Sequence, residues 1–252
     1  RTCAQKRGAA LLYPRAQELM GAGPSSPSEK QAAVLQDGLG SRCAEAAYTI
    51  VAADVLLLCT GAGFSADSGL AIYADVAKIP AYADRGLEYY DVCQPHWLNE
   101  EPELFWGFWG QCYNDYRDTA PHEGYEIIDR WVDRLFRRSA TASRLQQVLS
   151  EQWPLLLGDG HKEPYRVEDS PGAFFVFTSN VDAHHFDWFR ASEIRECHGN
   201  TEIYQCIASG GDGPCMPRVW RAPRDFRFKV EASTMLAPAG PACTQGSGQG
   251  AA

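Results

Sequence analysis

Three short apolar runs, each followed by glycine or polar residues, are the strongest pattern along the chain. They cover residues 55–59, 173–178 and 193–197. A short apolar run bounded by such residues predicts a buried strand. The polar residues that follow would then lie at the carboxyl ends of the strands, where parallel α/β sheets bind their ligands.

Apolar residues at helical spacing fill the stretches before and between these runs. Such faces span residues 43–51, 104–116 and 125–135, and residues 139–172 hold one more amphipathic stretch. We interpret the face at 104–116, which includes Trp109 and Tyr116, as that of a core helix rather than as an exposed aromatic platform. Strands that alternate with helices predict an α/β fold. We therefore expect a Rossmann-like parallel sheet with crossover helices.

The two ends of the chain differ in composition from this central region. Residues 1–40 contain a turn-rich stretch and are predicted to be a linker or a poorly ordered segment. Residues 238–252 consist mainly of small and polar residues, which predicts a disordered tail. We assign residues 41–200 to the main domain and residues 201–237 to a small module that contains cysteines.

Two further patterns give local predictions. Phe226, Phe228 and Val230 alternate within the small module, which predicts an edge strand. Cys59 and Cys197 lie in predicted strands, and we interpret them as small core residues.

The first apolar run leads into a glycine turn. Gly61 and Gly63 permit a tight turn that brings backbone N–H groups close to a ligand, and Ser65 or Asp67 is suited to cap a following helix. With Ala66, the two glycines also satisfy the pattern G-x-G-x-x-G/A. A strand, a glycine turn and a helix N-terminus form a phosphate cradle, although a plain strand-turn-helix is the simpler alternative.

The second and third runs end in groups that suit a nucleotide and its chemistry. Asn180 and Asp182 offer an amide and a carboxylate, and His198 is a candidate general acid or base. Helix capping by Asn180 and a hydrogen-bonded structural role for His198 are the plainer alternatives. We interpret His184 and His185 as packing at a helix start or as polar surface groups. Together with the glycine turn, these ends suggest chemistry on a dinucleotide.

Composition narrows the classes of protein. Hydrophobic residues make up 45% of the 252 residues, enough for a sizeable core, and the net charge of -9 argues against a nucleic-acid partner. No apolar run is long enough to span a membrane, and the chain does not begin with a secretion signal pattern. Its nine cysteines are scattered, which suits a reducing compartment. We therefore expect an intracellular protein, cytoplasmic or nuclear. The first residue is Arg1 rather than Met, which favours a fragment or a processed product.

Three stretches resemble motifs of the sirtuins, the family of NAD-dependent protein deacylases. GAGFSADSGL, residues 61–70, resembles the family's Gly-Ala-Gly-x-Ser-x-x-Ser-Gly-Ile stretch. TSNVDAHH, residues 178–185, resembles Thr-Gln-Asn-Ile-Asp-x-Leu-His, and ECHGN, residues 196–200, resembles Glu-Leu-His-Gly-Ser. The resemblance covers about residues 41–206, and its three motifs occur in the family's order.

The resemblance implies a Rossmann-like domain with a small zinc-binding module, NAD as cofactor and an acylated-lysine protein or peptide as substrate. His198 would be the general base that activates a ribose hydroxyl. The residues implied in NAD binding belong to the glycine turn, its continuation and the second strand end: Gly61, Ala62, Gly63, Ser65, Tyr73, Ser179, Asn180 and Asp182.

The sequence also departs from the family pattern. The aspartate and arginine that usually follow the first motif are replaced by Ile72 and Ala74, at positions concerned with nicotinamide departure. The family binds zinc through two Cys-x-x-Cys pairs, and this chain has no such pair in the corresponding region. If zinc binds, the candidate ligands are the single cysteines Cys206, Cys215 and Cys243. The family also continues into further strands, which indicates that this chain is C-terminally incomplete or ends differently.

These observations leave more than one function open. The first is NAD-dependent lysine deacylation, or a related NAD glycohydrolase or ADP-ribosyltransferase activity. The second is a pseudoenzyme that binds NAD without turnover, or an inactive fragment. An ordinary Rossmann dehydrogenase fits less well, because no acidic residue ends a second strand about 20 residues after the glycines.

Overall fold

The structure is a computed structural model that describes residues 38–71, 79–157, 166, 170–205 and 219–238. The chain divides into two units after Ala44. Of the first unit, only the first turns of helix α3 (Leu39–Ala52) are described. Everything below concerns the second unit, which contains all three predicted strands.

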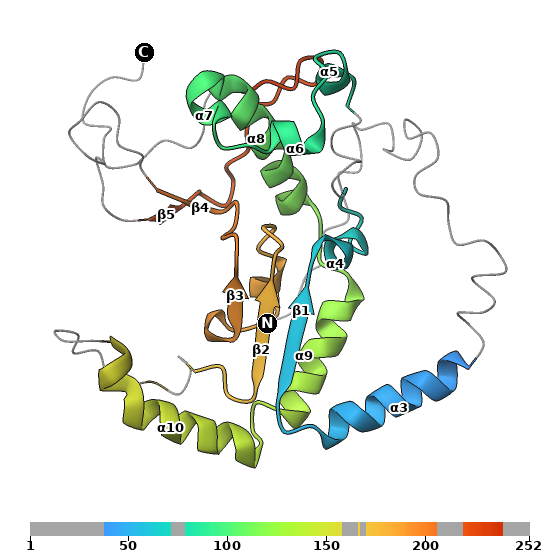
Figure 1. The fold of residues 1–252 in the computed structure, drawn as a ribbon, viewed down its shortest axis with the longest axis vertical. Coiled ribbons are helices and arrows are strands. Elements are labelled where there is room, and N and C mark those ends of the chain that lie inside the picture. Colours follow the sequence, from blue (N-terminus) through green and yellow to red (C-terminus); the bar gives the residue numbers. More distant parts are fainter. Residues whose placement is uncertain (1–37, 72–78, 158–165, 167–169, 206–218, 239–252) are drawn as a thin grey trace. The chain divides into compact units, whose positions relative to one another are not determined.

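A parallel three-stranded sheet organises this unit (Figure 1). Its strands are β1 (Leu56–Thr60), β2 (Phe174–Thr178) and β3 (Ile194–Glu196), in the order β1-β2-β3. The three strands lie within one residue of the predicted positions. Both pairs of neighbours are parallel, so the prediction of an α/β fold with a parallel sheet is confirmed.

Helices fill the long connection from β1 to β2, as a parallel pair requires. The longer ones are α8 (Pro102–Asp118), α9 (Glu123–Leu135) and α10 (Ala140–Leu157). The shorter ones are α4 (Ala62–Ala66), α5 (Pro80–Ala83), α6 (Tyr89–Val92) and α7 (Trp97–Glu100). Two single-turn 3-10 helices, η3 (His184–Asp187) and η4 (Ala191–Glu193), connect β2 to β3.

Three apolar clusters of described residues hold these elements together, the smallest of them around Tyr113, Ala222 and Phe228. The first lies between the sheet and α9 and includes Tyr125 and Val132 of the helix and Phe174 and Val176 of β2. The second surrounds α8, whose apolar face buries Leu104, Phe108 and Cys112. α8 was predicted as a core helix, and its burial confirms this.

The two faces of the sheet differ in burial. Leu56 and Leu58 of β1 pack into the first cluster, whereas Leu57 is 59% exposed and Phe177 of β2 is 46% exposed. Because neighbours on a strand point to opposite faces, Cys59 shares the open face with Leu57. Cys59 is exposed, so its predicted place in the core is wrong. Cys197, in the turn after β3, is also exposed rather than buried.

The prediction of an edge strand at residues 226–230 is also wrong. The small antiparallel pair in this region is formed instead by β4 (Ile203–Tyr204) and β5 (Trp220–Arg221). The backbone of Phe228 is held by the side chain of Asn114, which donates to its carbonyl and accepts from its N–H, both at 3.0 Å. A side-chain amide of α8 thus takes the place of a neighbouring strand. Phe228 is buried against Tyr113.

Among the described residues, no helix is both long and apolar enough to cross a membrane.

Candidate functional site

The predicted glycine turn is short, because helix α4 begins at Ala62 and already includes Gly63. Gly61 is the N-cap residue, with extended backbone and no side-chain cap, and Asp67 is the C-cap. The prediction that Ser65 or Asp67 caps the start of this helix is therefore wrong. Gly63 is exposed, and a Cβ atom built on it would meet nothing within 4 Å. The fold itself does not require glycine at this position, whereas close approach of a ligand to the backbone would.

Behind the turn lies a buried cluster of three polar side chains, each no more than 6% exposed. The Ser65 hydroxyl donates to Asp182 Oδ2 and accepts from Asn180 Nδ2, the latter at 2.8 Å. Asp182 Oδ1 accepts from the backbone N–H of His184 at 2.9 Å. These bonds join the turn after β1 to the loop after β2, so residues 117 positions apart in sequence fix one another.

A second polar layer supports this cluster from inside the sheet. Thr60 and Thr178 are opposite each other at the ends of β1 and β2, and their hydroxyls are 2.8 Å apart. Thr60 Oγ1 also lies 3.0 Å from Nε2 of His185, and Thr178 Oγ1 accepts from the backbone N–H of Asn180. Burial is the main cause that lowers the pKa of His185 to about 4, so this imidazole is neutral at pH 7.

His184 and His185 are 3% and 1% exposed. Of the two interpretations offered above, packing at a helix start is confirmed, because both residues open η3. The ring of His185 packs against Tyr125 and Phe64, with ring centroids 5.2 and 5.9 Å apart.

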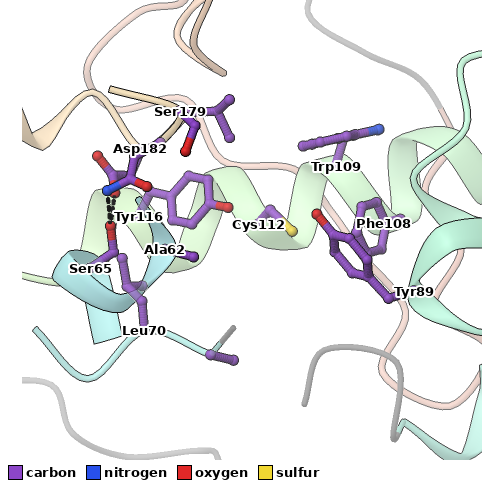
Figure 2. Close-up of a pocket in the computed structure, with 13 residues that line it drawn as sticks. Ala62, Ser65, Leu70, Tyr89, Phe108, Trp109, Cys112, Tyr116, Ser179 and Asp182 are labelled. Carbon is purple, nitrogen blue, oxygen red and sulfur yellow. Dashed lines mark hydrogen bonds between the residues drawn. The ribbon is translucent and has the colours of Figure 1, made fainter. Parts of the chain in front are cut away.

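The polar cluster forms one end of a pocket, which we call the polar pocket (Figure 2). The loops after β1 and β2 contribute Ala62, Ser65, Ser179, Asn180, Val181 and Asp182. Helix α8 contributes Phe108, Trp109, Cys112 and Tyr116, and Leu70, Ala71 and Tyr89 complete the lining. Figure 2 shows Ser65 and Asp182 at one end, the rings of Tyr89, Phe108 and Trp109 at the other, and Tyr116 with Cys112 between them.

The walls contributed by α8 carry no charge at neutral pH. Burial raises the pKa of Cys112 to about 12 and raises the pKa of Tyr116 well above its usual range. A thiol held in its protonated form is a poor nucleophile, so Cys112 acts as an apolar wall. Among the described residues that line the polar pocket, Asp182 is the one acidic residue.

His198 lies in a second pocket, which we call the aromatic pocket. Its aromatic walls are Trp106, Trp109, Tyr204 and Phe228, and Val181, His198, Asn200, Thr201 and Ile203 complete it. Trp106 stacks on Phe228 with ring centroids 5.7 Å apart. Trp109 and Val181 line both pockets, so the two are neighbours. The imidazole of His198 is exposed.

The structure thus groups most of the predicted site residues at the ends of the strands. Ala62, Ser65, Ser179, Asn180 and Asp182 line one pocket. Gly61 and Gly63 lie at the start of α4, Gly61 as its N-cap and Gly63 as its second residue. His198 lines the adjoining pocket rather than the same one.

The remaining predicted residues lie outside the described part of the chain: Tyr73, Cys206, Cys215 and Cys243. Within the described ranges, no three or more histidine, cysteine or acidic residues are grouped so that they could hold a metal ion.

Sequence reasoning missed the contribution of α8 to both pockets. Trp109 and Tyr116 were interpreted as core residues because they follow the apolar face of the helix, and a pocket wall has the same periodicity as a core. Val181 was also missed, because it looks like an ordinary apolar residue between Asn180 and Asp182.

The chain matches no protein-family model and no curated protein sequence. Among solved structures, it is similar to a Sir2 homologue in complex with NAD, at 14% identity and a TM-score of 0.42, over 78% of this chain and 60% of that one. A mutant Sir2 homologue in complex with 2′-O-acetyl ADP ribose gives 17% identity and a TM-score of 0.41, over 71% and 52% of the two chains.

This chain therefore spans less than two thirds of the length of either structure. At these TM-scores the likeness assigns neither a family nor a ligand, so a function for this chain has to rest on its own residues.

Proposed function

We propose that this chain is a sirtuin-like, NAD-dependent protein lysine deacylase, which moves an acyl group from lysine to ADP-ribose with release of nicotinamide. One observation carries the proposal. The pocket that holds the buried Ser65, Asn180 and Asp182 cluster shares the walls Trp109 and Val181 with the pocket that holds His198. Groups suited to bind a cofactor thus lie next to a group suited to move a proton.

The residues at the polar pocket fit part of an NAD molecule. The open space above Gly63 would let the backbone N–H groups of the turn approach a phosphate. The polar pocket has a volume of about 90 Å³, well below that of typical whole-ligand sites, so it suits one ring of the dinucleotide. When bound, NAD would supply an electrophilic ribose carbon and nicotinamide as the leaving group.

The aromatic pocket fits the other substrate. Trp106, Tyr204 and Phe228 offer apolar ring faces to the aliphatic part of an acylated lysine, and together they would exclude water from the reacting groups. Neutral imidazoles accept protons near neutral pH. His198 would act there as the general base that takes a proton from a ribose hydroxyl, a role that typically accelerates a reaction by about 10²–10⁴.

A second candidate function is NAD binding without turnover. It is favoured by Ile72 and Ala74, which replace the aspartate and arginine of the family motif where nicotinamide departs. Without that aspartate and arginine, the glycine turn would still contact NAD in the ground state, whereas the release of nicotinamide would slow. NAD glycohydrolase or ADP-ribosyltransferase activity is the remaining alternative, because it would need the polar pocket but not the acyl-lysine.

The deciding experiment measures nicotinamide release by the purified chain, with and without an acetyl-lysine peptide, beside calorimetric titration with NAD. Release that requires the peptide supports deacylation, and binding without release supports the second candidate. Release that ignores the peptide supports glycohydrolase activity. Absence of NAD binding would overturn all three.

Two variants assign the roles within the site. His198→Ala should lower peptide-dependent release by about 10²–10⁴ and leave NAD affinity nearly unchanged. Gly63→Val should instead abolish NAD binding, since its side chain fills space that the protein leaves open. His96→Ala is a matched control, because His96 is an exposed histidine before α7, at the N-cap position, and lines neither pocket.

A further inference from the structure

His198 sits on a turn that is fixed to the neighbouring loop at both ends. The backbone N–H of Cys197 donates to the carbonyl of Thr178, and that of Thr201 donates to the carbonyl of Val181, each at 3.0 Å. Between these two points, Gly199 adopts φ +68°, which lets the chain reverse direction. The position of His198 in the aromatic pocket therefore depends on the conformation of this turn.

A side-chain hydrogen bond closes the turn at its base. Asn200 Nδ2 donates to Glu196 Oε2 at 2.6 Å, so the bond spans His198 and Gly199. Asn200 Oδ1 accepts from the backbone N–H of Glu202 at 3.0 Å, which fixes the orientation of the amide. Glu196 is the last residue of β3 and lies opposite Thr178, so this bond ties the turn to the sheet.

The other carboxyl oxygen of Glu196 has no such partner. Oε1 is inaccessible to solvent and lacks a hydrogen bond in the described part of the chain. Three charged groups lie nearby. Asp182 and Glu202 disfavour a negative charge on Glu196, and Arg221 favours it. Arg221 is already engaged, because it pairs with Glu202 at 2.7 Å. The buried oxygen without a hydrogen bond and the two acidic neighbours thus make ionisation of Glu196 less favourable than in water.

We propose that Glu196 is a positioning residue for His198, whose protonation state sets how firmly the Asn200 bond holds the turn. This inference rests on the function proposed for His198, but the state of the turn can be measured without it. The ionised carboxylate accepts a charge-assisted hydrogen bond from Asn200, which is roughly twice as strong as the bond accepted by the neutral acid. The turn is therefore tighter when Glu196 is ionised and looser when it is protonated.

The carboxyl group of Glu196 titrates near neutral pH. Burial is the main cause that raises the pKa of its carboxyl to about 7, and the bond from Asn200 opposes this shift. The switch between the two states of the turn is thus centred near neutral pH. The proton would leave Glu196 as the pH rises, with no change at the backbone anchors of the turn.

The direct test is NMR titration of the ligand-free protein. The side-chain amide signals of Asn200 should move with a midpoint near pH 7 in the parent and show no such inflection in Glu196→Gln, which keeps an acceptor but cannot ionise. Asn200→Ser, which weakens the bond, should raise the midpoint of the Glu196 carboxyl signal. The proposal is overturned if the parent shows no inflection near neutral pH, or if Glu196→Gln shows the same one.

The functional arm compares pH profiles of peptide-dependent nicotinamide release. Glu196→Gln should match the parent at pH 6 and be about fivefold slower at pH 8.5, because only the ionised form gains the stronger bond. Glu45→Gln, an exposed residue of α3, should follow the parent throughout. Equal profiles for parent and Glu196→Gln would refute the positioning role. If neither the parent nor any variant releases nicotinamide, the proposed function fails. The NMR titration would still show whether the protonation of Glu196 changes the turn.

Discussion

The polar and the aromatic pocket meet at Trp109 and Val181, yet they are built in different ways. The polar pocket is closed by buried side chains that bond to one another, with Ser65, Asn180 and Asp182 each no more than 6% exposed. The aromatic pocket is lined by rings, and its one histidine lies exposed on a turn after β3.

This difference separates two tasks that a transfer enzyme has to combine. Groups that bind in the ground state gain from fixed positions, because ordering them costs little when the ligand arrives. A group that moves a proton gains from lying within hydrogen-bond reach of that proton, and for His198 this position depends on the conformation of one turn. Substitutions in the first pocket should therefore change NAD binding and stability, whereas substitution of His198 in the second pocket should change rate.

Asp182→Ala should give the largest effect. The carboxylate accepts from Ser65 and from the backbone N–H of His184, so its removal leaves two buried donors unpaired. We expect NAD affinity to fall about a hundredfold and the free energy of unfolding to fall by about 1–3 kcal/mol. Calorimetric titration and urea unfolding measure the two quantities.

The control for this prediction is Asp84→Ala, an exposed carboxylate after α5, which should change neither quantity. An Asp182→Ala variant that binds NAD within twofold of the parent would show that the polar pocket is not where the cofactor binds.

Two tryptophans of α8 test whether the pockets are separable. Trp109 lines both pockets, whereas Trp106 lines only the aromatic one. Trp109→Ala should weaken both NAD binding and peptide binding about tenfold, and Trp106→Ala should weaken only peptide binding by about that factor. The measurement is the NAD dissociation constant beside the KM for an acetyl-lysine peptide. Trp131→Ala, at a 42% exposed position on α9, should leave both unchanged.

The fold was predictable as far as apolar patterning reaches. The three strands and the long helix α8 occur where the sequence places them, because apolar runs and helical spacing report directly on burial. Cys59 shows the limit of this kind of prediction, because a continuous apolar run does not tell which face of a strand is buried. Phe226 and Phe228 alternate like a strand, but the side-chain amide of Asn114 bonds the backbone of Phe228, and the N–H of Phe226 donates to the carbonyl of Pro223.

The sequence predicted which strand-end residues lie near one another in the candidate site, but not the contribution of α8 or the bonds within the site. Strand ends and the three motifs pointed to Asn180, Asp182 and His198, and the structure places them at neighbouring pockets. The bond between Ser65 and Asp182 joins distant segments, and no local pattern encodes it. The pKa of Glu196 likewise depends on burial among groups from other elements, which appear only once the chain is folded.

The smallest expected effect concerns the layer behind the polar pocket. Folding lowers the pKa of His185 from its usual 6.5 to about 4, because the ring is buried. Between these values the unfolded chain binds a proton that the folded chain does not, so stability falls as the pH drops through 6.5 and levels off below 4. From pH 7.5 to 5.5 the loss attributable to His185 should be about 1 kcal/mol.

Glu196 titrates in the same range with the opposite sign. Its raised pKa of about 7 makes the folded chain bind the extra proton, so its contribution to stability grows as the pH falls from 7 towards 4.5.

The measurement is therefore the difference in unfolding free energy between the parent and His185→Gln at each pH, in which the contribution of Glu196, common to both proteins, cancels. Gln keeps an amide that can reach Thr60 but cannot be protonated, so the two curves should converge as the pH falls. Parallel curves from pH 7.5 to 5.5 would mean that the polar pocket is not supported by a buried neutral imidazole. The contrast between a pocket of buried, mutually bonded side chains and a pocket with an exposed histidine would then lose part of its structural basis.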